Sequence, residues 1–164
     1  MKKPDQIPVA IIMGSKTDLK VMTAATDALK EFKVAYETKI VSAHRTPEEM
    51  FAFAKTAADK GYKIIIAGAG GAAHLPGMVA SLTILPVIGV PVTVGGLKGL
   101  DALLSIAQMP KGVPVATVAV DNAYNAGLLA IRILSLNDPK LKRQLAAYQT
   151  KQKQKVRAMN KSLR

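Results

Sequence analysis

Two histidines are the only imidazole side chains in this 164-residue chain, and each stands in a segment suited to chemistry. His44 lies in residues 42–47, Ser-Ala-His-Arg-Thr-Pro, directly before Arg45. His74 lies in the glycine-rich residues 68–78, Gly-Ala-Gly-Gly-Ala-Ala-His-Leu-Pro-Gly-Met. Histidine exchanges a proton readily near neutral pH, and arginine is well shaped to bind a phosphate or a carboxylate. The two segments therefore predict proton transfer and electrostatic stabilisation on a small anionic substrate.

A third polar segment, residues 14–18, supplies hydroxyl groups and a carboxylate. Ser15, Thr17 and Ser42 are neutral donors for phosphate oxygens, although a plain turn role for Ser15 is an almost equal alternative. Asp18 stands where a helix is predicted to begin. It suits both a helix cap and an acceptor for ligand hydroxyls such as those of a ribose. For both histidines, a position soon after a predicted strand favours a functional role over a purely structural one.

Strands and helices that alternate along the chain must position these segments. Apolar runs predict strands at residues 8–14, 34–41, 63–67, 85–92 and 113–120, with 34–41 as a candidate edge strand. Periodic segments predict helices between them: from residues 15–18 to 33, from Thr46 as the cap to Gly61, after the glycine-rich segment to about Thr83, at 100–107, and from 121–122 to about 136.

This alternation predicts an α/β fold. We expect a three-layer αβα, flavodoxin-like sandwich with a parallel five-stranded sheet in the order 2-1-3-4-5 and a C-terminal helical extension. Ligands bind in such sheets beyond the carboxyl ends of the strands, at the switch point between strands one and three. Because all three polar segments follow strands, we expect them to share that rim.

The composition limits the remaining possibilities. A chain of this length with 49% hydrophobic residues suits one domain, predicted at residues 1–138. The absence of cysteine excludes disulfides and, with only two histidines, argues against a metal site. Residues 68–73 formally match a dinucleotide fingerprint, but they follow the third strand and lack the downstream acidic residue, so no cofactor is expected. Without a membrane-spanning run or a signal segment, we expect a cytoplasmic protein with no membrane partner.

The net charge of +12 is concentrated in residues 139–164, which hold nine of the 23 basic residues and none of the 11 acidic ones. This segment is predicted to form a basic helix with an apolar stripe. We expect the stripe to pack on neighbouring subunits. Nucleic-acid binding is disfavoured, since aromatic residues for base stacking are nearly absent. The stripe comprises Leu141, Leu145, Tyr148, Gln152, Val156, Met159 and Leu163.

Four motifs at compatible spacing resemble the N5-carboxyaminoimidazole ribonucleotide mutase family of purine biosynthesis. They are residues 13–18, 42–47, 68–78 and 108–117, and the likeness runs from about Val9 to about Leu134. The resemblance implies an isomerase that moves a carboxylate from the exocyclic nitrogen of aminoimidazole ribonucleotide to ring carbon C4, giving 4-carboxy-5-aminoimidazole ribonucleotide. It implies decarboxylation, trapping of the CO2 and recarboxylation at C4, with neither a metal nor an organic cofactor.

The resemblance also implies roles for individual residues. His44 matches the family's acid/base histidine, which takes the proton from C4. Arg45 matches the position that binds the phosphate, and Asp18 the position for the ribose. The substrate site that the motifs predict as a whole comprises Ser15, Thr17, Asp18, Ser42, Arg45, Gly70, Gly71, Ala72, His74 and Leu75. Members of the family are octamers, so a homo-octamer is implied, as is functional coupling to the ATP-dependent synthase that makes the carbamate.

Two other functions remain open at this stage. A related carboxylase makes the same product from free CO2, but its members tend to carry lysine where this chain has Arg45, which favours the mutase. A nucleotide-binding module without catalysis is the more distant alternative.

Overall fold

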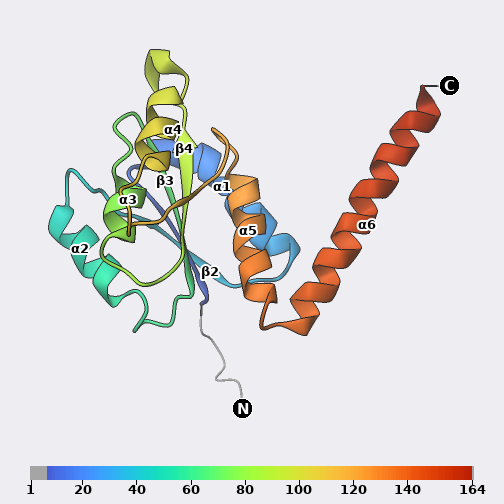
Figure 1. The fold of residues 1–164 in the computed structure, drawn as a ribbon, viewed down its shortest axis with the longest axis horizontal. Helices are drawn as coiled ribbons and strands as arrows, with labels where there is room; N and C mark the ends of the chain where they lie inside the picture. Colours follow the sequence, from blue (N-terminus) through green and yellow to red (C-terminus); the bar gives the residue numbers. More distant parts are fainter. Residues whose placement is uncertain (1–6, 164) are drawn as a thin grey trace.

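The computed structural model describes residues 7–163, which build a parallel sheet with helices on both faces (Figure 1). The sheet has five strands in the order β2-β1-β3-β4-β5, and every neighbouring pair is parallel. This confirms the predicted fold and strand order, with β2 at the edge. The strands are β1 (Val9–Met13), β2 (Tyr36–Ile40), β3 (Ile64–Gly70), β4 (Val87–Val92) and β5 (Ala116–Thr117). The α-helices are α1 (Leu19–Glu31), α2 (Pro47–Thr56), α3 (Leu75–Ala80), α4 (Leu100–Ala107), α5 (Ala123–Ser135) and α6 (Pro139–Ser162).

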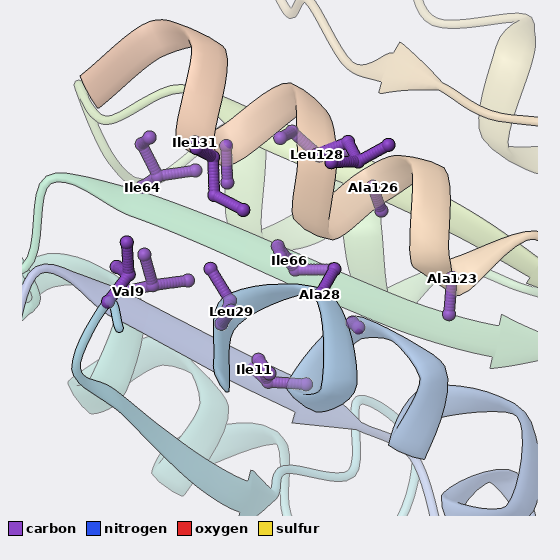
Figure 2. Close-up of a cluster of buried hydrophobic side chains, with 14 of the residues drawn as sticks. Val9, Ile11, Ala28, Leu29, Ile64, Ile66, Ala123, Ala126, Leu128 and Ile131 are labelled. Carbon is purple, nitrogen blue, oxygen red and sulfur yellow. The ribbon is translucent and has the colours of Figure 1, made fainter. Parts of the chain in front are cut away.

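The central strands are apolar along their whole length because helices cover both faces of the sheet. β1 shows the consequence: its odd-numbered residues join one hydrophobic cluster and its even-numbered residues join another. The first cluster lies under α1 and α5, and the second under α2, α3 and α4. Figure 2 shows the first cluster, in which Ile64 and Ile66 of β3 lie between side chains of the two helices.

Close packing of α1 against α5 holds this first layer together. A Cβ atom added to Gly127 would lie 2.8 Å from Cβ of Ala28 and 2.9 Å from the carbonyl oxygen of Ala25. Both distances are below van der Waals contact, so the two helices approach each other closely only because glycine stands there.

All five strands differ from their predicted bounds, and the differences at β3 and β5 matter most for the rim of the sheet. β3 continues to Gly70, so that Gly68 pairs with Met13 on one side and Val90 on the other. Gly68 and Gly70 of the glycine-rich segment are therefore strand residues, and Gly71 forms the turn. β5 is much shorter than the predicted 113–120, because Pro114 has no N–H to donate to a ladder.

Three predictions about helix ends are also wrong. α3 stops at Ala80 rather than near Thr83, where a tight bond from the N–H of Leu82 to the carbonyl of Val79 (3.0 Å) closes it. α2 ends at Thr56, and turns carry the chain on to Gly61. The Thr46 hydroxyl does not cap α2, and it donates to the carbonyl of Ser42 at 3.3 Å.

The long helix α6 runs away from the sheet (Figure 1). Asp138 caps it by accepting from the N–H groups of Lys140 (2.8 Å) and Leu141 (3.2 Å). The first half of the predicted stripe packs on its own chain: Leu141 is buried, and the Tyr148 ring lies 5.6 Å from that of Phe32. The second half is exposed: Val156, Met159 and Leu163 are 52%, 57% and 84% accessible. None of the helices that the structure describes is long and apolar enough to cross a membrane.

Candidate active site

Loops at the carboxyl ends of β1, β2 and β3 surround a cleft of about 240 Å³. The cleft lies where the chain order of the sheet reverses, because β1 has β2 on one side and β3 on the other. Its lining comes from residues 14–18, 42–45 and 69–75, and from Val94 after β4. The three polar segments of the sequence therefore meet at one rim, as predicted.

The first loop is a short helical turn, η1 (Lys16–Asp18), which a reciprocal pair of bonds holds in place. The Ser15 hydroxyl accepts from the N–H of Thr17 at 3.2 Å, and Asp18 Oδ2 accepts from the N–H of Ser15 at 2.9 Å. The hydroxyls of Ser15 and Thr17 are also hydrogen-bonded to each other. The prediction that Asp18 is a helix cap is wrong: Ser15 is the N-cap residue of η1, Asp18 is its partner at the third position, and the Asp18 side chain does not cap α1. Asp18 is 5% exposed, so the turn holds a carboxylate at the floor of the cleft.

The second loop presents Arg45 across the rim. Ser42 Oγ accepts from the backbone N–H and from Nε of Arg45, at 3.2 and 3.3 Å. Arg45 Nη2 donates to the carbonyl of Gly14 at 2.8 Å, which ties the second loop to the first. The guanidinium is thus oriented before any ligand binds, and within the described chain its Nη1 makes no hydrogen bond.

Close packing positions the third loop. A Cβ atom added to Gly70 would collide with the Val94 side chain and would lie 2.8 Å from the carbonyl oxygen of Val92. The N–H of the intervening Thr93 donates to Asp121 Oδ1 at 2.8 Å, which fixes the segment that covers Gly70. Gly71 then turns the chain with a φ of +63°, a backbone conformation that residues with a Cβ atom rarely adopt. The loop re-enters the core at once, with Ala73 and Leu75 almost fully buried.

The two histidines meet in the cleft although they are 30 residues apart in sequence. His44 Nε2 lies 2.8 Å from His74 Nδ1, within hydrogen-bond distance. The rings are edge to face, with an interplanar angle of 87° and centroids 4.9 Å apart. Both side chains are exposed in the single chain. The arrangement offers a pair of coupled imidazoles beside an arginine and a buried carboxylate, which suits proton transfer on an anion.

The structure places every predicted site residue at this cleft except Gly71, which forms the turn behind it. Their roles in binding and catalysis stay predictions. Sequence reasoning missed four further lining residues. Gly14 could have been found, because it directly follows β1, whereas Val94 carries no polar signal. The predicted residues that line the cleft are Ser15, Thr17, Asp18, Ser42, His44, Arg45, Gly70, Ala72, His74 and Leu75, and the missed ones are Gly14, Ala43, Ala69 and Val94.

Within residues 7–163, no three His, Asp or Glu side chains lie close enough together to hold a metal ion.

A protein family, curated relatives and solved structures each match nearly the whole chain. A family described as AIR carboxylase matches residues 8–155. A relative from Pyrococcus horikoshii, named N5-carboxyaminoimidazole ribonucleotide mutase, is 57% identical over 98% of this chain and 91% of that protein. A relative from Vigna aconitifolia, named Phosphoribosylaminoimidazole carboxylase, chloroplastic, is 60% identical over 90% of this chain but only 27% of that protein. The crystal structure of Treponema denticola PurE has a TM-score of 0.86 at 30% identity, covering 95% of this chain and 98% of that one.

Proposed function

This chain belongs to the AIR carboxylase family, and we infer that it is an isomerase of purine biosynthesis, an N5-carboxyaminoimidazole ribonucleotide mutase. It converts N5-carboxyaminoimidazole ribonucleotide to 4-carboxy-5-aminoimidazole ribonucleotide. The observation that carries the inference is the 57% identity, along 98% of the chain, to a relative that bears this name.

The chemistry needs one base and a closed pocket. The carbamate C–N bond breaks, CO2 leaves, and the electron pair stays on the exocyclic nitrogen, which takes a proton. Ring carbon C4 then attacks the CO2 and loses its own proton to a base. We assign that base to His44, because it lies in the cleft at the switch point and exchanges protons near neutral pH.

The groups around His44 suit the rest of the nucleotide. Arg45, already oriented by Ser42 and Gly14, would bind the phosphate together with the hydroxyls of Ser15 and Thr17. Asp18 would accept hydrogen bonds from the ribose. The turn around Gly70, Gly71 and Ala72, with Leu75 and His74 beside it, would hold the carboxylate that moves, since glycine lets backbone N–H groups approach a ligand closely.

We propose that neighbouring subunits complete this site within a homo-octamer. The cleft of one chain is open and, at about 240 Å³, lies below the roughly 300 Å³ at which typical ligand pockets begin. Neutral CO2 would escape from such a cleft unless it were covered. Exposed apolar residues that could form the interfaces lie on or beside α4, at Leu97, Leu100 and Leu104, and on the distal half of α6. In this arrangement residues 1–138 form the catalytic domain, the first half of α6 packs on its own chain, and the exposed distal half of α6 packs on other subunits.

Light scattering on the full chain tests the assembly, and a monomer at working concentration would contradict it. We further propose that the enzyme acts in the cytoplasm and receives its substrate from the ATP-dependent synthase, because a carbamate on nitrogen readily loses CO2.

An assay with aminoimidazole ribonucleotide and bicarbonate, with and without that synthase and ATP, tests the reaction. The mutase should turn over efficiently only when the synthase supplies the carbamate. The Vigna aconitifolia relative, named as a carboxylase, makes carboxylation by free CO2 the second candidate. Efficient turnover at modest bicarbonate without synthase or ATP would establish that alternative instead.

Replacing His44 by Asn tests the catalytic assignment. We expect kcat to fall by at least about 1,000-fold while nucleotide affinity stays near that of the wild type. Unchanged turnover would remove His44 from the mechanism, and a wild-type protein that binds the nucleotide without converting it would be a binding module.

A further inference from the structure

The contact between the two histidines restricts which atom of His44 can act as the base. His44 Nε2 is 2.8 Å from His74 Nδ1, so one of these two nitrogens carries a hydrogen and the other accepts it. With Nε2 occupied by this contact, a base role for His44 falls to Nδ1.

The direction of the shared hydrogen bond decides whether that atom is a base at all. In a neutral imidazole one nitrogen carries the hydrogen and the other has a lone pair. If His74 Nδ1 donates, the hydrogen of His44 sits on Nδ1, and the ring cannot accept a proton there. If His44 Nε2 donates, Nδ1 has the lone pair and is ready. His74 must therefore accept through Nδ1 and carry its own hydrogen on Nε2.

We propose that His74 is the positioning residue that holds His44 in this tautomer, and that the two rings share a single proton during the reaction. The proposal rests on the proposed function for its kinetic consequences, but not for the state of the pair itself. His74 here acts as an acceptor that steadies the imidazolium formed on His44, a role that a carboxylate has in many catalytic triads.

The protons of the reaction balance across this pair. When His44 Nδ1 takes the proton from C4, the C–H electron pair returns to the imidazole ring of the product. The new positive charge spreads through the Nε2–H group to His74 Nδ1. The protonated pair gives one proton from His44 Nδ1 to the exocyclic nitrogen when the C–N bond breaks, and His44 Nδ1 takes one back from C4 after the C–C bond has formed. A pair that releases and regains one proton beyond its two ring N–H groups matches this requirement.

The pair can be observed directly, because the chain has no other histidine. We would label the full-length protein with ¹⁵N-histidine and follow the ring nitrogens by NMR from pH 4 to pH 9, without substrate. We expect both neutral rings to show the Nε2–H tautomer. In His74→Phe, which removes the acceptor, the neutral His44 ring should show a mixture of the two tautomers. A neutral His44 ring that carries its hydrogen on Nδ1 in the wild type would overturn the proposal.

Kinetics of two variants test the positioning role. His74→Phe keeps a ring but removes the acceptor, and kcat should fall about 100-fold, far more than KM rises. His74→Asn keeps an acceptor oxygen near the place of Nδ1, so it should recover about tenfold of that loss, with a pH profile of kcat that differs from the wild type. His74 is exposed, so both variants should fold, which their melting temperatures would check.

Three outcomes separate the possibilities. If His74→Phe leaves kcat and its pH profile unchanged, His74 does not position His44. If the same variant raises KM alone, His74 is only a substrate contact, and the proposal is again wrong. If the wild type lacks mutase activity, the proposed function fails, whereas the NMR titration still decides the state of the pair.

Discussion

The loops that carry the two histidines reach the same cleft, but different forces hold them. The β2–α2 loop, with His44, lies on an exposed rim and is fixed by hydrogen bonds from Arg45 to Ser42 and Gly14. The β3–α3 loop, with His74, is fixed by packing: Gly70 lies against Val94 and the Val92 carbonyl.

This difference indicates that substitutions in the β2–α2 loop should lower activity without lowering stability. Substitutions in the packed β3–α3 loop should lower both. Exposed hydrogen bonds contribute little to folding, since water replaces them in the unfolded chain. Close packing contributes to both, because a misfit in it shifts the backbone that bears the catalytic group. Substitutions in the two loops therefore test whether hydrogen bonds hold one loop and packing holds the other.

The largest effect is expected at Gly70. In Gly70→Ala the new methyl group has no space beneath Val94, so the loop must shift. We expect a loss of about 1–3 kcal/mol in the free energy of unfolding and a fall of about 100-fold in kcat/KM. Urea unfolding and steady-state kinetics measure the two.

Gly96→Ala is the matched control, because no heavy atom lies within 4 Å of a Cβ added there. It should change stability by less than about 0.5 kcal/mol. A Gly70→Ala protein as stable as this control would show that packing does not position the loop.

At Arg45 we expect a large loss of substrate affinity without a loss of stability, in contrast to Gly70. In Arg45→Ala we expect KM to rise about 30- to 100-fold, because the oriented guanidinium is lost, while the melting temperature stays near that of the wild type. Arg45→Lys keeps the charge but not the planar fork and should fall between the two. If Arg45→Ala lost as much stability as Gly70→Ala, the contrast between the loops would be wrong.

The sequence predicts the hydrogen-bonded loop better than the packed one. Arginine, histidine and serine in one short motif predict proton transfer and anion binding from the sequence. The hydrogen bonds between Ser42 and Arg45 join residues that are close in the chain. The strand order and the turn capped by Ser15 likewise follow from alternation and from adjacent polar residues. These features depend on neighbours in the chain, so their patterns are visible there.

The rest depends on contacts between distant segments. Nothing in the sequence places Val94 over Gly70, because an apolar residue after a strand has many possible neighbours. The shared rim of His44 and His74 is predictable from parallel topology, but the facing of Nε2 to Nδ1 is not, since it depends on side-chain rotation. The hydrogen bond of the Thr46 hydroxyl also depends on side-chain rotation, so the sequence predicts a cap whereas the structure shows a bond to the carbonyl of Ser42.

Ser42 should show a smaller effect that stays within the polar loop. Ser42→Ala removes the acceptor for two donors of Arg45, so the guanidinium loses part of its orientation. We expect KM to rise about five- to tenfold, equivalent to about 1 kcal/mol, with kcat nearly unchanged. Ser135→Ala, at the end of α5, also loses one local hydrogen bond and is the control. Equal kinetics in the two variants would mean that Ser42 does not orient Arg45.

The smallest effect on activity is expected at the opposite end of the sheet, where a hydrogen bond and burial act together. Tyr62, which precedes β3, is 4% exposed, and its hydroxyl donates to Glu37 of β2. Burial and this bond raise the pKa of Tyr62 to about 12. The bond from Tyr62, followed by that of Lys39, lowers the pKa of Glu37.

These two pKa shifts fix the pH dependence of the contact. A lowered carboxyl pKa stabilises the fold above the unfolded value of about 4.3, and the contribution is lost as pH falls through the folded value. A raised phenol pKa stabilises below about 10, and this contribution is lost as pH rises toward 12. Tyr62→Phe should therefore lose about 1 kcal/mol at pH 7 and show a flatter stability curve at both ends. Its kcat/KM should equal that of the wild type. Urea unfolding at pH 4, 7 and 11 checks this, and a curve parallel to the wild type would place the stabilisation in packing alone.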